Sequence, residues 1–222
     1  MAAVIFDFDG VIADSEPIHL GAFRDAFEAR GWPLDAERYF DRYLGFGDRD
    51  LVQAYGKDYD LRLDEAVVSA VLQDKEAAFA RRLGSGAVLF RGARSCIERL
   101  SARFALAIAS GALRAEIEHV LQANDLRHHF PVIVSIDDVG RGKPAPDPYL
   151  QASAGLGESP EHCVAIEDSE GGIESAVAAG LLVIGVTTSR PAAALSRAHT
   201  VVSSLDQITA EGVARLLGSR GL

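Results

Sequence analysis

Lysine is scarce in this chain of 222 residues. Among the 22 basic residues only Lys57, Lys75 and Lys143 are lysines, and the net charge is −10. General binding of nucleic acid requires a basic surface that displaces counterions, so we expect no nucleic-acid partner. An acidic protein can still bind an anionic substrate if it concentrates positive charge at one place. The surroundings of each lysine are therefore informative.

Cysteine and long apolar runs are also scarce. Cys96 and Cys163 lie far apart without a CxxC spacing, so we expect packed thiols and neither a disulfide framework nor a zinc site. No apolar run reaches about 18 residues and no basic segment precedes the first apolar stretch, so we expect neither a membrane span nor a secretion signal. A cytoplasmic location is the expectation that follows. The hydrophobic content of 48% and charged content of 24% are typical of a globular enzyme.

The first apolar stretch ends in two acids. The run from Val4 to Phe6 has the β-branched and aromatic composition of a buried parallel strand, yet Asp7 and Asp9 follow directly, before Gly10. Burying such charges costs several kcal/mol, roughly, unless a cation or hydrogen bonds compensate. The pattern therefore favours a bound metal ion, although a strand followed by an ordinary Asp-Gly turn is the alternative.

Hydrophobic periodicity divides the chain into a helical stretch and an alternating stretch. Helices are predicted over 18–29, 35–43, 48–56 and 64–83, with no convincing strand between residues 14 and 83. An ordinary crossover uses one helix, so residues 14–83 are predicted to be an inserted helical domain. The core domain would then comprise residues 1–13 and 84–222.

The remaining chain alternates between strands and helices. Strands are predicted over 104–109, 132–135, 163–166, 182–186 and 200–202. Helices are predicted near 92–102, 113–123, 146–155, 171–179 and 206–218, with a further short helix before residue 200. This alternation predicts an α/β fold in which helices cover both faces of a parallel sheet, and ligands bind beyond the carboxyl ends of its strands.

Polar residues stand at the carboxyl ends of four predicted strands. They are Asp7 and Asp9, then Ser110-Gly111, Gly142-Lys143-Pro144 and Glu167-Asp168-Ser169. If the strands are neighbours, these groups face one crevice and supply carboxylates for Mg²⁺, donors for an anion and a single ammonium. Each group alone has an ordinary explanation, as a turn, a solvated loop residue or a helix cap.

In this order the motifs resemble those of the haloacid dehalogenase superfamily. The resemblance is closest to its branch of sugar-phosphate phosphatases and β-phosphoglucomutase-like proteins, and it spans nearly the whole chain. It implies a Rossmann-like core with a mobile helical cap, residues 14–83, hinged at Asp14-Ser15 and Gly84-Ser85-Gly86. Dehalogenase members lack an acid two residues after the nucleophile, so Asp9 disfavours halide chemistry.

The resemblance implies roles for both acids of the first motif. Asp7 would be the nucleophile that forms an aspartyl-phosphate, and Asp9 would be the general acid and base. Mg²⁺ would be held by the carboxylates of Asp7 and Asp168 and by the backbone carbonyl of Asp9. Glu167 would be either a partner of these ligands or an occasional ligand itself.

The resemblance also implies substrate contacts. Ser110 and the backbone N–H of Gly111 would bind phosphoryl oxygens, and Lys143 would bridge the phosphate and the nucleophile. In the segment from Gly45 to Asp50, Arg49 is a candidate substrate contact, and its alternative is an ion pair with Asp48 or Asp50. His19 is a second candidate, and its alternative is a histidine on a helix face with no ligand.

One departure from the mutase pattern separates two activities. β-Phosphoglucomutases follow the serine of the second motif with a serine and a lysine that grip a distal phosphate, whereas this chain has Ala112, Leu113 and Arg114. We therefore expect Mg²⁺-dependent hydrolysis of a small phosphorylated metabolite by a monomer or weak dimer. A β-phosphoglucomutase and a non-catalytic phosphometabolite-binding regulator are the alternatives.

Overall fold

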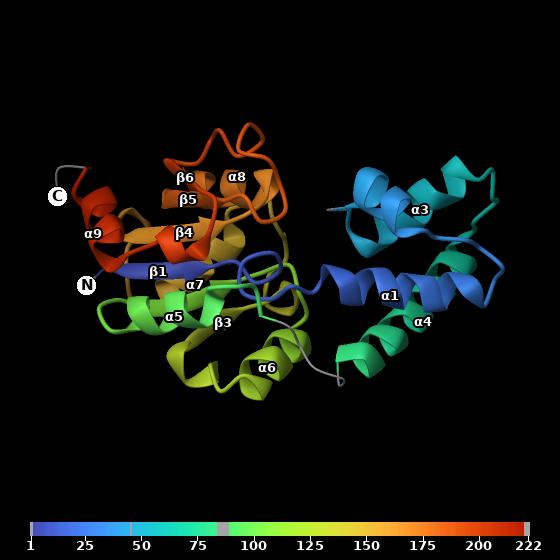
Figure 1. The fold of residues 1–222 in the computed structure, drawn as a ribbon, viewed down its shortest axis with the longest axis horizontal. Coiled ribbons are helices and arrows are strands. Elements are labelled where there is room, and N and C mark those ends of the chain that lie inside the picture. Colours follow the sequence, from blue (N-terminus) through green and yellow to red (C-terminus); the bar gives the residue numbers. More distant parts are fainter. Residues whose placement is uncertain (1, 45, 84–88, 220–222) are drawn as a thin grey trace. The chain divides into compact units, whose positions relative to one another are not determined.

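Strands drawn from distant parts of the sequence form one parallel sheet. The structure is a computed structural model that describes residues 2–44, 46–83 and 89–219, and within these residues the sheet has six strands. In chain order they are β1 (Ala3–Phe6), β2 (Ala105–Ala109), β3 (Val132–Val134), β4 (Cys163–Glu167), β5 (Leu182–Val186) and β6 (Thr200–Val202). Their spatial order is β3-β2-β1-β4-β5-β6, so β1 lies between β2 and β4 (Figure 1).

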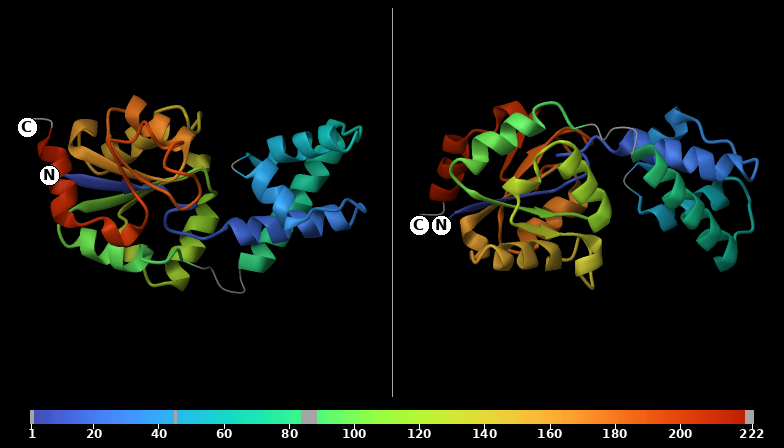
Figure 2. Two further views of the ribbon diagram at one scale, coloured as in Figure 1. Left: turned by 45° about the horizontal axis from the view of Figure 1, so that its top comes forward. Right: turned by 90° about the horizontal axis from the view of Figure 1, so that it is seen from below.

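Helices cover both faces of this sheet. They are α5 (Ala93–Ser101), α6 (Arg114–Ala123), α7 (Asp147–Gly155), α8 (Glu170–Ala178) and α9 (Ala210–Gly218). Alternate strand residues such as Ile5 and Ala165 pack in one buried cluster with residues of α7 and α8, while α5 and α9 lie on the opposite face (Figure 2). Every residue of β1 and β4 is buried because both faces are covered. The predicted α/β fold is confirmed.

Two local predictions in this part of the chain are wrong. The short helix expected before residue 200 is a series of turns over 192–197, in a stretch where Leu195 alone is buried, so no apolar helix face exists to pack. The helix predicted near 206–218 is instead a 3-10 turn, Leu205–Gln207, followed by α9, which begins at Ala210 because the Thr209 side chain caps it by accepting from the Gly212 N–H.

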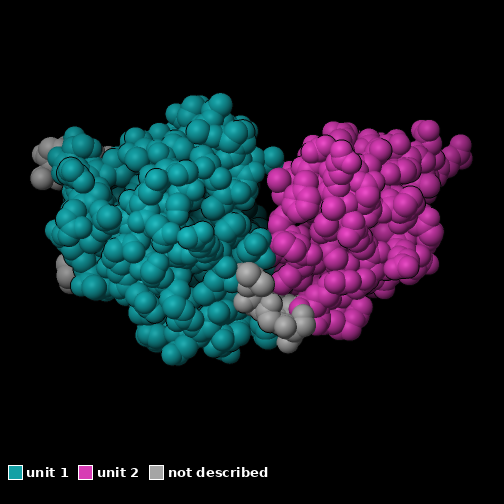
Figure 3. All heavy atoms as spheres, in the orientation of Figure 1, with its two compact units in different colours: residues 1–14, 87–222 teal, residues 15–86 magenta. Residues whose placement is uncertain are grey.

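The chain divides into two compact units (Figure 3). Unit 1 comprises residues 1–14 and 87–222 and contains the sheet, and unit 2 comprises residues 15–86. Where the chain returns to unit 1, the Phe90 N–H donates to the Ile12 carbonyl at 3.0 Å, so the two segments of unit 1 that flank the insertion are joined side by side. The predicted hinge Gly84-Ser85-Gly86 and Gly45 lie outside the described residues.

The described part of unit 2 is helical. Its elements are α1 (Glu16–Glu28), α2 (Ala36–Arg38), a π-helical segment (Tyr39–Tyr43), α3 (Asp48–Asp58) and α4 (Glu65–Leu83). Aromatic side chains such as Phe23, Phe27 and Tyr55 fill its separate core, and this burial stabilises the short helices. No helix in the described ranges is long and apolar enough to cross a membrane.

Candidate active site

The register between β1 and β4 brings two acids to one edge of the sheet. Phe6 pairs with Ile166, and the Asp7 N–H donates to the Ile166 carbonyl at 2.9 Å. Side chains alternate along a strand, so Glu167 lies on the same face as Ala165, which α7 and α8 cover. Asp7 is 7% exposed and Glu167 is fully buried. The carboxyl ends of two neighbouring buried strands thus each carry a buried carboxyl group.

Lys143 joins these two acids. Its Nζ lies 2.6 Å from Asp7 Oδ1 and 2.6 Å from Glu167 Oε1. Burial alone would lower the pKa of Lys143, but the carboxylates of Asp7 and Glu167 outweigh that effect and raise the pKa above its usual value. The lysine is therefore a permanent cation at the end of β1.

Glu167 accepts hydrogen bonds at both of its oxygens. Oε1 accepts from Lys143 and from the Tyr149 hydroxyl at 2.9 Å. Oε2 accepts from the Asp168 N–H at 3.0 Å, the Ser169 N–H at 3.1 Å and the Ser169 hydroxyl at 3.0 Å. A carboxylate offers about four lone-pair positions, so these five donors leave little room for a metal ion. The geometry favours the first of the two predicted roles, in which Glu167 is a partner of the metal ligands and not a ligand itself.

Asp168 lies against the turn that follows β1. Gly10 has a φ of +77°, and a Cβ placed on it would lie 1.9 Å from Asp168 Oδ2. A glycine is therefore needed both for the backbone conformation and for the approach of this carboxylate. The Thr188 hydroxyl donates to the Gly10 carbonyl at 2.5 Å, and Ser189 hydrogen-bonds Asp168.

The charge of this cluster calls for a further cation. Oxygen atoms of Asp7, Glu167 and Asp168 lie within 4.8 Å of one another, and the ammonium of Lys143 contacts only Asp7 and Glu167 among these acids. Burial, followed by repulsion from Glu167 and Asp168, raises the pKa of Asp7 well above its usual value despite Lys143. Burial and Glu167 raise the pKa of Asp168 to about 7. Hard carboxylate oxygens with excess negative charge fit Mg²⁺.

Ser110 follows the strand next to β1. β1 pairs with β2 so that Phe6 lies opposite Ile108, and Ser110 therefore comes at the same edge of the sheet as Asp7. Its N–H donates to the Val134 carbonyl at 2.9 Å, and its Oγ accepts from the Ala112 N–H at 3.0 Å. A Cβ placed on Gly111 would meet no atom within 4 Å, so this turn has open space beside it.

Asp9 lies in the turn between β1 and unit 2. Its backbone forms an isolated bridge with Ala13, and the Gly10 N–H donates to the Ala13 carbonyl at 2.9 Å. The residue is half-buried, in contrast to Asp7. The two acids of the first motif therefore have different surroundings, as different chemical roles require.

His19 and Arg49 belong to unit 2. Arg49 donates to Glu65 Oε1 at 2.6 Å, so its ion pair is with the start of α4 and not with either neighbouring aspartate. His19 Nδ1 lies 3.0 Å from Lys75 Nζ, and its ring packs on Phe79 with centroids 4.4 Å apart. Lys75 is buried and is the hydrogen-bonding partner of His19, and no sequence motif had marked it as a site residue.

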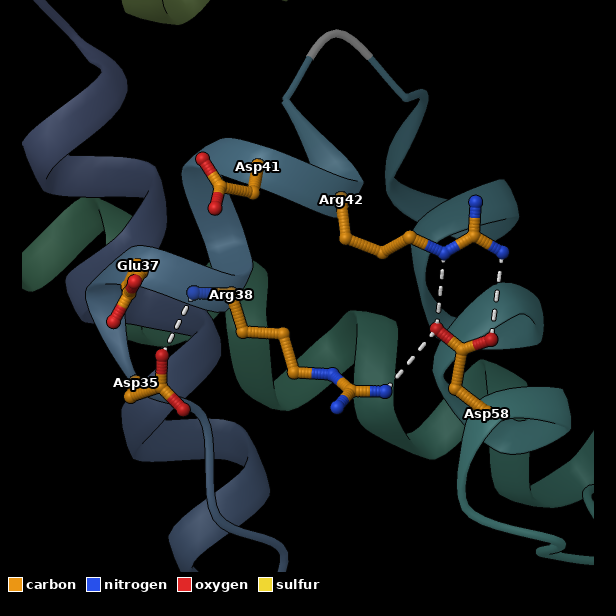
Figure 4. Close-up of a pocket in the computed structure, with 6 residues that line it drawn as sticks. All are labelled: Asp35, Glu37, Arg38, Asp41, Arg42 and Asp58. Carbon is orange, nitrogen blue, oxygen red and sulfur yellow. Dashed lines mark hydrogen bonds and ion pairs between the residues drawn. The ribbon is translucent and has the colours of Figure 1, made fainter.

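A separate pocket in unit 2 also carries charged side chains (Figure 4). It has a volume of about 500 Å³ and is lined by Asp35, Glu37, Arg38, Asp41, Arg42 and Asp58. Both arginines point at Asp58, with Arg42 Nε at 3.1 Å and Arg38 Nη2 at 3.5 Å from its Oδ2. Hydrogen bonds from Arg42 and Tyr43 hold the pKa of Asp58 below its usual value. Because its four acidic side chains outnumber the two arginines, the pocket is a poor site for an anion.

Sequence patterns missed three side chains that complete the site in unit 1. Tyr149 is on the first turn of α7, and Thr188 and Ser189 follow β5. The run of hydroxyl residues from Thr187 to Ser189 could have indicated Thr188 and Ser189 as site residues, because it follows a predicted strand, as the four motifs do. For Tyr149, the signal was a phenol in the helix that follows Lys143.

Gly172 allows Glu167 to lie beside the start of α8. A Cβ placed on Gly172 would lie 1.7 Å from Glu167 Oε1, so either the helix or the carboxylate must move. We expect Gly172→Ala to lower the free energy of unfolding by about 1–3 kcal/mol, as overpacking does, and to reduce activity. Denaturant unfolding measures the first effect. Gly171→Ala is the matched control, since its Cβ would meet no atom within 4 Å, and equal losses in both variants would contradict the argument.

The fold and the site together define a hydrolase class. The profile of the haloacid dehalogenase-like hydrolase family matches residues 1–180. The chain belongs to this family, which confirms the resemblance inferred from the four motifs.

Three relatives illustrate the range of the family near this chain. CbbY of Rhodobacter capsulatus is 34% identical over 191 residues, covering 83% of this chain and 84% of its own. A phosphorylated carbohydrates phosphatase of Thermotoga maritima is 33% identical over 183 residues, covering 82% of each. The crystal structure of a mutant CbbY from Rhodobacter sphaeroides with xylulose-(1,5)bisphosphate has a TM-score of 0.83 and 26% identity, covering 96% of this chain and 99% of that one.

Proposed function

We propose that this protein is a Mg²⁺-dependent phosphatase that hydrolyses a small phosphorylated sugar or similar metabolite through an aspartyl-phosphate. The observation that carries the proposal is the cluster of Asp7, Lys143 and Asp168 at the carboxyl edge of the sheet. The relatives named above support it, since one is a phosphatase of phosphorylated carbohydrates and another binds a sugar bisphosphate.

Asp7 and Asp9 divide the chemistry between them. A carboxylate oxygen of Asp7 attacks phosphorus, and the bond from phosphorus to the leaving oxygen breaks while Asp9 gives that oxygen a proton. Asp9 then takes a proton from water as the water oxygen attacks the phosphorus of the aspartyl-phosphate. Phosphate leaves, and Asp7 and Asp9 return to their starting states. The lysine contact at 2.6 Å favours the ionised form of Asp7 that the first step needs.

Positive charge at the site would bind and stabilise the phosphate dianion of the substrate. A divalent cation held by the carboxylates of Asp7 and Asp168 and the backbone carbonyl of Asp9 would offset repulsion between nucleophile and phosphate. Lys143, the Ser110 hydroxyl and the Gly111 N–H would bind phosphoryl oxygens. His19 and Arg49, which belong to unit 2, stay predictions as substrate contacts.

Hydrolysis is favoured over a mutase reaction because of the segment after Ser110. Arg114 is the nearby cation, and its Nη2 donates to the Ile133 carbonyl at 2.8 Å and to Asp138 Oδ2 at 2.6 Å. Ala112 is buried and carries no group that can bind phosphate. Binding both ends of a bisphosphate requires donors that this segment does not offer.

A phosphate-release screen tests the proposal. The purified protein is incubated with Mg²⁺ and a panel of phosphorylated sugars and small acids, beside the variant Asp9→Asn. We expect release from at least one sugar phosphate, reduced by about 10²–10⁴-fold in the variant because general acid–base catalysis is lost. Equal release by both proteins would indicate a contaminating phosphatase and contradict the proposal.

Removal of divalent cations is expected to abolish phosphate release. A chelator should reduce the rate to background and added Mg²⁺ should restore it, because the three buried acids carry more negative charge than the ammonium of Lys143 offsets. In Asp168→Asn the Mg²⁺ concentration for half-maximal activity is expected to rise by about tenfold or more. Full activity in the chelator, measured on the same substrate, would exclude the metal site.

A further inference from the structure

Tyr149 is a buried residue that the proposed mechanism does not use. It lies on the first turn of α7 and is 0% exposed. Its hydroxyl donates to Glu167 Oε1 at 2.9 Å, and its ring centroid lies 5.0 Å from Lys143 Nζ. Tyr149 therefore contacts Glu167 and Lys143, and Lys143 in turn contacts the proposed nucleophile, Asp7.

The phenol competes with the lysine for one carboxylate oxygen. Lys143 Nζ has two acceptors at the same distance of 2.6 Å, Asp7 Oδ1 and Glu167 Oε1. A phenol keeps its proton at neutral pH, because its ordinary pKa is about 10, so it donates to Oε1 and offsets part of the charge there. Without that hydrogen bond, Glu167 attracts Lys143 more strongly and Asp7 shares less of the ammonium.

The chain holds this arrangement in place from both sides. Arg141 spans the lysine loop by donating to Asp147 at 3.2 and 3.0 Å. The Ser175 hydroxyl on α8 donates to the Ala145 carbonyl at 2.5 Å. The backbone between Lys143 and Tyr149 is held at these points. Loss of the hydroxyl therefore changes how Lys143 is shared between Glu167 and Asp7 while the backbone of the loop stays in place.

We propose that Tyr149 is a positioning residue whose hydroxyl holds Glu167 so that Lys143 stays shared with Asp7, ready for the phosphoryl group. The inference rests on the proposed function, since it assigns Lys143 to the phosphoryl group of the substrate. It adds to that function a residue outside the four sequence motifs.

Tyr149→Phe tests the role, since it removes the hydroxyl and keeps the ring over Lys143. We expect kcat to fall about tenfold, in line with the loss of other partners that orient site residues. We expect the Kd for orthophosphate, titrated calorimetrically, to rise about threefold because Lys143 moves toward Glu167. A kcat and a Kd within twofold of those of the unchanged protein would overturn the proposal.

Tyr55→Phe is the matched control. Tyr55 is also buried, and its hydroxyl donates to the Pro33 carbonyl at 2.8 Å within unit 2. Both variants lose one hydrogen bond of a buried tyrosine, so Tm is expected to fall in both, with the changes in kcat and orthophosphate affinity confined to Tyr149→Phe. A loss of activity that follows Tm equally in both variants would show a merely structural role and overturn the proposal.

A double variant tests the path through Glu167. In Glu167→Gln the oxygen no longer carries the charge that Tyr149 offsets, so adding Tyr149→Phe should change kcat and orthophosphate affinity by less than about twofold. If Tyr149→Phe lowers kcat and orthophosphate affinity by the same factors in the Glu167→Gln protein as in the unchanged protein, the proposal is overturned. If the unchanged protein hydrolyses no phosphoester, the proposed function fails, and the orthophosphate titrations alone then decide the role of Tyr149.

Discussion

Asp7→Asn is expected to reduce phosphate release by at least about 10⁴-fold, the scale of losing a nucleophile. The amide is a poor nucleophile, yet it has the shape of the carboxyl group and can still accept from Lys143, now 2.6 Å from Asp7 Oδ1. Burial and two neighbouring acids raise the pKa of Asp7, so its charge is costly at neutral pH. The free energy of unfolding, measured without divalent cations, should therefore be unchanged or higher.

Asp60→Asn is the control for Asp7→Asn. Asp60 is exposed and has a φ of +51°, a conformation that asparagine also tolerates, so this substitution should leave activity and stability unchanged. Steady-state phosphate release and denaturant unfolding measure both variants. Residual activity above about 1% in Asp7→Asn would contradict the role of Asp7 in covalent catalysis.

Lys143→Met is expected to affect both activity and stability. It leaves Asp7 and Glu167 buried without their shared cation, and breaking such a pair costs about 3–5 kcal/mol of unfolding free energy. The loss of a donor to the phosphoryl group should lower kcat by about 10²–10³-fold. Added Mg²⁺ should restore part of the stability, since it replaces positive charge at the cluster, but not the activity.

Lys57→Met separates this effect from the general loss of a lysine. Lys57 is exposed on α3, so its replacement should change the unfolding free energy by no more than about 0.5 kcal/mol. Unfolding curves with and without Mg²⁺, together with kcat, measure both variants. A Lys143→Met protein as stable as Lys57→Met in the absence of Mg²⁺ would contradict the electrostatic description of the site.

The contacts between the motifs could be predicted because they depend on strand ends. Asp7 follows β1 and Glu167 ends β4, so both come at the carboxyl edge of the parallel sheet once the strands are identified. Lys143 could be added because it was the one lysine in a motif that follows a predicted strand. Alternation of strands and helices predicts the edge at which these residues lie, whereas the strand order that makes β1 and β4 neighbours was a condition of the prediction that the structure supplies.

The role of Glu167 could not be predicted in the same way. Its five hydrogen bonds come from Lys143, Tyr149, Asp168 and Ser169, and the Tyr149 bond depends on how α7 packs against the sheet. Helix packing is set by side-chain shapes rather than by a repeating pattern. The same holds for unit 2, where the π-helical turn at Tyr39–Tyr43 breaks a stretch whose periodicity predicted one helix over 35–43.

Trapping of the covalent intermediate tests the central claim most directly. The protein is mixed with a hydrolysed substrate and Mg²⁺, quenched within the first turnover and treated with hydroxylamine, which converts an acyl phosphate to a hydroxamate. Mass spectrometry of the peptides then locates the modified residue. We predict a hydroxamate at Asp7 that is absent without substrate and absent in Asp7→Asn. Turnover with no modification at Asp7, or with modification at a different acid, would contradict the account.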